Sequence, residues 1–211
     1  MINKFNEFQI HEICKRYGIK NYTIRDGLVD VDGDVSLGNM NLTRLPLKFG
    51  NVSGGFYCTD NQLTSLEGSP REVGGNFYCH NNQLTSLEGA PKEVGGYFSC
   101  SNNNLTTLEG APKQVGVGFY CYSNQLTSLQ GAPKEVCGYF DCHNNQLTTL
   151  EGAPKQVGGY FYCKSNRLPE EIINFDDIEY ILKWQDEYNI WRKDGSLDPF
   201  RFKQMIDDYD K

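Results

Sequence analysis

The sequence predicts a repeat solenoid built on a parallel β-sheet, with helical caps at both ends. Two observations support this prediction. Six cysteines recur every 21 residues between Cys58 and Cys163, and a strict period of this length is typical of chains that stack one structural unit per repeat. Within each unit, apolar and polar residues alternate over a short stretch, which favours a β-strand with one buried face.

Residues 1–29 are expected to form an N-terminal helical cap. Four residues follow helical spacing and give this helix one apolar face: Ile10, Ile13, Cys14 and Tyr17. The following stretch, YGIKNYTI, leads into the sheet. Such a cap is needed because an outermost repeat would otherwise expose its apolar face to water.

Residues 30–169 are expected to hold about seven turns of the repeat, the first of them degenerate. In the turn around Phe77, the alternation places Phe77 and Cys79 inside and Asn76 and Tyr78 outside. Three columns of identical residues run through the six regular turns. The phenylalanine column is Phe56, Phe77, Phe98, Phe119, Phe140 and Phe161; the cysteine column is Cys58, Cys79, Cys100, Cys121, Cys142 and Cys163; the asparagine column is Asn61, Asn82, Asn103, Asn124, Asn145 and Asn166.

The repeat unit resembles the leucine-rich repeat, whose core pattern is L-x-x-L-x-L-x-x-N-x-L. The last four fixed positions and, with one residue inserted, the first are matched by Phe77, Cys79, Asn82, Leu84 and Val73. The resemblance implies a leucine-rich repeat solenoid with its parallel β-sheet on the concave face and a helix-poor convex side.

At the level of the whole chain, the near-identical units between a short helix and an acidic tail resemble leucine-rich repeat proteins of tailed bacteriophages. This resemblance implies a protein of the infected bacterial cytoplasm. It also implies a role in binding and inhibiting a host protein, for example an antiviral defence component.

Residues 170–211 are expected to form an acidic C-terminal helical cap. After Asn174, the expected N-cap, a helix is predicted from four spaced aromatic residues: Tyr180, Trp184, Tyr188 and Trp191. A last short helix should begin with Asp198 as its cap and Pro199 at its first position. Because the segment carries 12 acidic and 6 basic side chains, an alternative interpretation makes its outer face a second docking surface.

Composition argues against several functions. The net charge of -7 disfavours binding to nucleic acid or an anionic membrane, which depends on Lys and Arg. No apolar run approaches the ~20 residues of a membrane span, and the start of the chain lacks the features of a secretory leader, so a cytoplasmic protein is expected.

No enzyme activity, metal or cofactor is expected. The cysteine column is interpreted as small apolar filler beside phenylalanine, whereas Cys137, outside the column, is a candidate reactive thiol. His80 and His143 hold the same repeat position three turns apart, which places them ~14 Å from each other. They therefore cannot share a metal ion.

The candidate binding site is the outward face of the strands, where the repeats differ most. Eight of the 13 tyrosines fall there, and tyrosine is enriched in binding surfaces. We therefore expect a protein partner that is blocked sterically; a carbohydrate ligand and a purely structural scaffold are the alternatives, and the sequence leaves the oligomeric state open. The candidate residues are Tyr57, Tyr78, His80, Tyr97, Tyr120, Tyr122, Tyr139, Asp141, His143, Tyr160, Tyr162 and Lys164.

Overall fold

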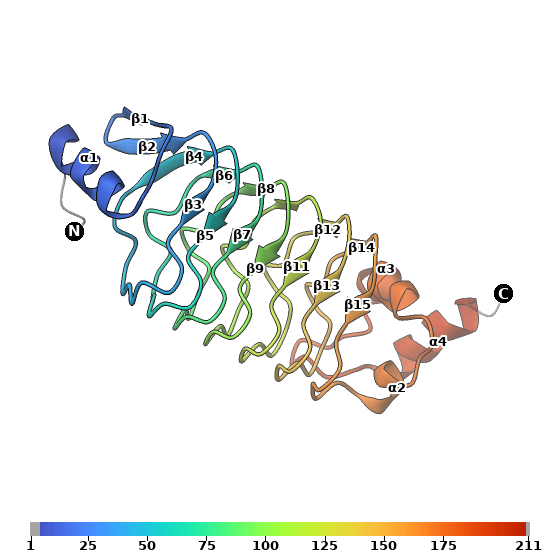
Figure 1. Cartoon of the computed structure of the whole chain (residues 1–211). Coiled ribbons are helices and arrows are strands. Elements are labelled where there is room, and N and C mark those ends of the chain that lie inside the picture. Colours follow the sequence, from blue (N-terminus) through green and yellow to red (C-terminus); the bar gives the residue numbers. More distant parts are fainter. Residues whose placement is uncertain (1–4, 210–211) are drawn as a thin grey trace.

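The computed structural model describes residues 5–209, so the extreme ends of both expected caps, residues 1–4 and 210–211, lie outside the described residues. It shows a parallel β-solenoid with helices at its two ends (Figure 1). Each regular turn contributes two very short strands, one to each of two sheets that run the length of the stack.

Sheet A has eight strands in the order β1-β2-β4-β6-β8-β10-β12-β14. All neighbours are parallel except β1 and β2, which form an antiparallel pair. The strands are β1 (Tyr22–Arg25), β2 (Leu28–Val31), β4 (Phe49–Val52), β6 (Glu72–Val73), β8 (Glu93–Val94), β10 (Gln114–Val115), β12 (Glu135–Val136) and β14 (Gln156–Val157).

Sheet B has seven parallel strands in the order β15-β13-β11-β9-β7-β5-β3. It contains the strand predicted from the alternation around each phenylalanine. The strands are β3 (Val35–Ser36), β5 (Phe56–Tyr57), β7 (Phe77–Tyr78), β9 (Phe98–Ser99), β11 (Phe119–Tyr120), β13 (Phe140–Asp141) and β15 (Phe161–Tyr162).

The second sheet was not predicted. In sheet A, Val73 pairs with Val94 and Glu72 with Glu93, in the same register from turn to turn. The valine side chains are buried, whereas the Glu and Gln side chains face solvent. Each regular turn therefore borders the core with two strands, one in each sheet, and each strand buries its apolar side chain.

The phenylalanine column forms the centre of the core. From Phe56 to Phe140 the rings are fully buried, and successive rings stack nearly parallel with centroids 5.1 to 5.5 Å apart. The thiols from Cys58 to Cys142 are also fully buried, which confirms the prediction that phenylalanine and cysteine point inward.

The asparagine column satisfies the backbone where the chain leaves sheet B. Asn103 is representative, since its Oδ1 accepts a hydrogen bond from the Leu84 N–H at 2.9 Å. Its Nδ2 donates to the carbonyl oxygens of Cys79 and Cys100, both at 3.1 Å. Because buried peptide groups need partners, each asparagine ties its own turn to the preceding one.

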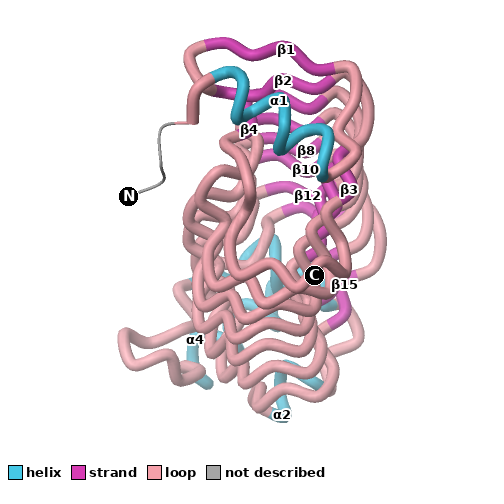
Figure 2. Tube along the Cα trace, turned by 60° about the vertical axis from the view of Figure 1, so that its left-hand side comes forward, coloured by secondary structure: helices cyan, strands magenta, loops and turns pink. Residues whose placement is uncertain are grey.

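The N-terminal cap has the predicted helix. Helix α1 (Glu7–Arg16) begins with a capping box between Asn6 and Gln9 and buries Ile10 and Cys14. It lies across the N-terminal end of the stack (Figure 2). The β1-β2 hairpin follows it and extends sheet A, so the N-terminal end is covered by a helix and an antiparallel strand together.

The C-terminal cap contains three helices: α2 (Glu170–Ile173), α3 (Ile178–Tyr188) and α4 (Pro199–Tyr209). The prediction for α4 is confirmed, because Asp198 Oδ1 accepts hydrogen bonds from the Phe200 and Arg201 N–H groups.

The predicted start of the preceding helix was wrong, and so was the inclusion of Trp191 in it. Asn174 is the C-cap of α2, and Asp177 caps α3 by accepting from the Tyr180 N–H at 2.9 Å. Helix α3 stops at Asn189, which has φ 49°. Trp191 therefore lies outside the helix, in an isolated antiparallel bridge with Leu197.

Candidate interaction surface

The outward side chains of sheet B form a surface that we call the sheet B face, defined by the twelve candidate residues named above. Parallel pairing keeps its middle column in register: Tyr57 is opposite Tyr78, and Asp141 is opposite Tyr120 on one side and Tyr162 on the other. The repeat thus brings residues from successive turns side by side, as the sequence predicted.

The tyrosines of this face contact one another in pairs. Tyr57 and Tyr78 meet edge to face with ring centroids 5.5 Å apart. The Tyr97 ring stacks on the Tyr120 ring at 5.7 Å. Burial raises the pKa of the Tyr78 and Tyr120 hydroxyls. In this N-terminal and central part, the tyrosines are half-buried and therefore partly structural.

Exposure is concentrated at the C-terminal end of the face. Tyr139, Tyr160 and Tyr162 have 40%, 66% and 43% of their surface exposed. The Tyr139 and Tyr160 rings stack with centroids 6.1 Å apart, and Tyr160 lies 5.8 Å from Tyr162. Together with the exposed Lys164, these three rings form a pre-arranged aromatic cluster.

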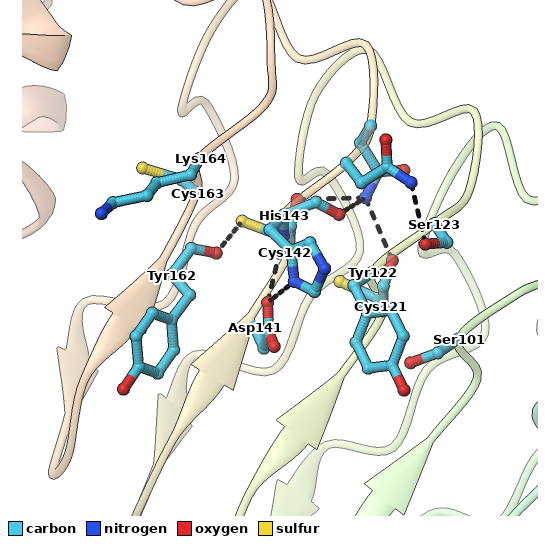
Figure 3. Close-up of polar contacts among 12 residues, drawn as sticks. Ser101, Cys121, Tyr122, Ser123, Asp141, Cys142, His143, Tyr162, Cys163 and Lys164 are labelled. Carbon is cyan, nitrogen blue, oxygen red and sulfur yellow. Dashed lines mark hydrogen bonds and ion pairs between the residues drawn. The ribbon is translucent and has the colours of Figure 1, made fainter.

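A carboxylate and an imidazole lie beside this cluster (Figure 3). Asp141 Oδ1 is 2.6 Å from His143 Nδ1 and also accepts the His143 backbone N–H at 3.1 Å. Because a carboxylate only accepts hydrogen bonds, Nδ1 carries the proton in this contact. The imidazole stacks on the Tyr122 ring at 4.7 Å, so two turns hold His143 in a fixed orientation.

In the turn around Phe98, the two positions equivalent to Tyr78 and His80 are not accessible. Ser99 and Ser101 are buried, and their hydroxyl oxygens lie 3.4 Å apart. His80 is half-buried, and its Nδ1 has no hydrogen-bond partner among the residues that the structure describes. Burial lowers the pKa of His80, against the opposing effect of Asp60. The centre of the face is therefore less polar than its sequence indicates.

All eight cysteines lie in the described part of the chain and are free thiols. Burial raises the pKa of Cys58 to about 12 and raises the pKa of the other thiols in its column. In the last turn Cys163 is only half-buried, whereas Cys137 is exposed. This pattern fits the interpretation of the cysteine column as packing.

Thiol labelling under native conditions should separate these classes. Cys137 is expected to react fastest, because it is exposed, followed by Cys163. The five fully buried thiols from Cys58 to Cys142 should react only after denaturation. Mass spectrometry of labelled peptides checks this order, with the Cys137→Ala variant as the control. Rapid native labelling of the buried thiols would contradict the packing described here.

A depression over sheet A is a second surface feature, and it was not predicted from the sequence. A depression of about 980 Å³ runs over sheet A, across the outward Glu and Gln side chains of β6 to β12 and the exposed backbone of Gly74, Gly95 and Gly116. Cys137 lines both this depression and a smaller one of about 440 Å³, which Leu182 and Lys183 of α3 also line. The only available signal was the glycine that follows four of the six column valines, Val73, Val94, Val115 and Val157.

Comparison with known proteins gives no relative, since no family model and no curated protein sequence matches the chain. Between residues 5 and 209, no helix is both long and apolar enough to cross a bilayer. The same described range contains no cluster of three or more His, Cys, Asp or Glu side chains arranged to hold a metal ion.

Proposed function

We propose that this chain is a non-enzymatic, leucine-rich-repeat-type binding protein whose sheet B face binds a protein partner. The observation that carries the proposal is the cluster of Tyr139, Tyr160 and Tyr162, which are exposed although they lie on an ordered sheet. Exposed apolar surface held on a rigid scaffold is typical of interaction sites.

The tyrosine cluster suits a protein partner in chemistry and in size. Each ring offers a large contact area and a polar hydroxyl at low cost in conformational entropy. The Tyr139–Tyr160 stack reduces that cost further, because the rings already restrain each other. Seven strands at ~4.8 Å spacing give a face ~30 Å long, which fits a partner that buries about 800 Å² of each surface.

The mechanism that follows is steric. A bound partner would have part of its own surface covered by a rigid solenoid, with most of the affinity coming from a few aromatic anchors. The resemblance to bacteriophage repeat proteins supports a bacterial host protein as the partner, with inhibition as the consequence. An antiviral defence component is a partner of this kind.

A carbohydrate ligand is the second candidate. It is favoured by one observation, the Tyr122–His143 stack beside the Asp141 carboxylate. Aromatic faces can stack on sugar rings, while the carboxylate and imidazole can bond to hydroxyl groups. A glycan ligand would depend on Asp141 and His143 more than on Tyr160 and Tyr162.

Affinity capture from bacterial lysate tests the proposal with a Tyr139→Ser, Tyr160→Ser, Tyr162→Ser variant. We expect the variant to lose the captured protein, because each anchor contributes about 2 kcal/mol, or about 30-fold in affinity. The matched control is Phe8→Ser with Phe200→Ser. These two aromatic residues are 73% and 78% exposed and lie on the caps.

Equal recovery of the same protein by the wild type and the tyrosine variant would contradict the proposal. Equal loss in the control variant would show that capture reflects exposed aromatic surface in general. A glycan array supplies the alternative outcome, in which binding requires Asp141 and His143 and no protein is captured in stoichiometric amount.

A further inference from the structure

The C-terminal edge of sheet B is open. In the described chain, β15 is the last strand of the sheet and pairs only with β13. One turn earlier, the N–H groups of Phe140 and Cys142 donate to the carbonyl oxygens of Tyr160 and Tyr162, at 3.0 and 2.8 Å. Phe161 and Cys163 hold the equivalent places in the last turn, and no later turn within residues 5–209 supplies acceptors.

Side-chain burial changes at the same edge. The inward residues of β13 and its turn, Phe140 and Cys142, are fully buried, whereas Phe161 and Cys163 are only half-buried. Helix α3 packs against β14, which is the end of sheet A. At the same end of the stack, β15 is the last strand of sheet B before the three cap helices (Figure 1).

We propose that β15 accepts an extended segment of the protein partner as an added parallel strand. This inference rests on the proposed function and specifies how the partner is held. Main-chain hydrogen bonds to an exposed sheet edge supply affinity, and alternate side chains supply specificity. The exposed Tyr160 and Tyr162 flank this edge, so the same aromatic cluster would contact the outer side of the added strand.

The repeat itself defines the chemistry of the occupant. The Phe161 ring stacks on Phe140 at 5.3 Å, so an aromatic side chain on the added strand continues the column. Two residues later, a small apolar side chain fits beside Cys163, as each cysteine fits beside the next. The residue between them points outward, and the carbonyl groups before and after the aromatic residue accept from Phe161 and Cys163.

Amide hydrogen exchange on the full chain, followed by NMR, tests this inference. The probe is a synthetic peptide with the sequence of residues 158–166 and the substitution Cys163→Ala, because this sequence already forms such a strand. At a peptide concentration ten times its dissociation constant, exchange of the Phe161 and Cys163 amides should slow about tenfold. The Tyr162 amide is the internal control, because alternate residues of a strand face opposite edges; it lies on the β13 side and should not change.

A scrambled peptide of the same composition is the matched control and should give no protection. The inference is overturned if the probe peptide leaves the Phe161 and Cys163 amides unchanged at millimolar concentration, or if the scrambled peptide protects them equally. It is also overturned if these amides become protected in the free protein as its own concentration rises, since the occupant is then a second copy of the chain.

The result is separable from the test of the proposed function. Capture depends on the outward tyrosines, whereas protection by the peptide depends on the backbone of β15. If a captured partner leaves the β15 amides unprotected, the sheet B face remains the binding surface, but the proposal of an added strand is wrong.

Discussion

The free energy of unfolding is expected to fall steeply above pH 9. Five thiols are fully buried, and burial raises their pKa above the ordinary value of 9.0. Above this pH the unfolded chain loses these protons while the folded chain keeps them, so rising pH favours unfolding. Each such thiol should lower the stability by about 1 kcal/mol per pH unit until its folded pKa is reached.

A single variant shows whether the buried thiols cause this loss. Cys100→Ala should reduce the loss of stability between pH 9 and pH 10 by about 1 kcal/mol, since it removes one titrating group. Urea unfolding of the variant and the wild type at a series of pH values measures the difference. An unaltered slope in Cys100→Ala would show that the thiols ionise without unfolding the core.

Replacement of a buried column asparagine should destabilise the solenoid strongly. Asn103→Ala leaves the Leu84 N–H without its acceptor, and the carbonyl oxygens of Cys79 and Cys100 lose a donor. An unsatisfied buried polar group costs about 1 to 3 kcal/mol, so a loss of about 3 kcal/mol is expected for the substitution.

Asn104→Ala is the matched control for this experiment. Asn104 is the next residue, is exposed, and makes one long side-chain contact, at 3.4 Å, with Gln125. Its replacement should change the stability by no more than about 0.5 kcal/mol. Urea unfolding followed by circular dichroism compares the two variants, and similar losses would show that the asparagine column is not what joins the turns.

The sequence predicted sheet B because its signal is long enough to recognise. Phe77, Tyr78 and Cys79 alternate in burial, and the sequence pattern of phenylalanine, any residue and cysteine recurs in every regular turn. Sheet A escaped prediction because a strand such as Glu72–Val73 has a single inward apolar residue and is followed by glycine, so no alternation marks it in the sequence. The start of α3 was predicted wrongly because Asn174 and Asp177 are both good N-cap residues. Only packing decides which of them is used.

The alignment of the candidate tyrosines along one sheet was predicted from the sequence, but the exposure of each ring was not. The repeat period sufficed to align the tyrosines on one face. The burial of Ser99 and the half-burial of Tyr78 depend on the positions of aromatic rings from neighbouring turns. An alignment of the repeats does not predict these positions. The exposed cluster at Tyr160 and the edge at β15 result from where the repeats end and how the cap packs there, and both are properties of the tertiary structure.

The claim that the sheet B face is the binding surface is tested most directly by footprinting its tyrosines in the presence of the captured partner. Covalent labelling of tyrosine, read by mass spectrometry, reports the exposure of each ring. The account predicts that Tyr139, Tyr160 and Tyr162 lose most of their labelling in the complex while the cap tyrosine Tyr188 does not change. Unchanged labelling of all three, with protection over sheet A instead, would contradict it.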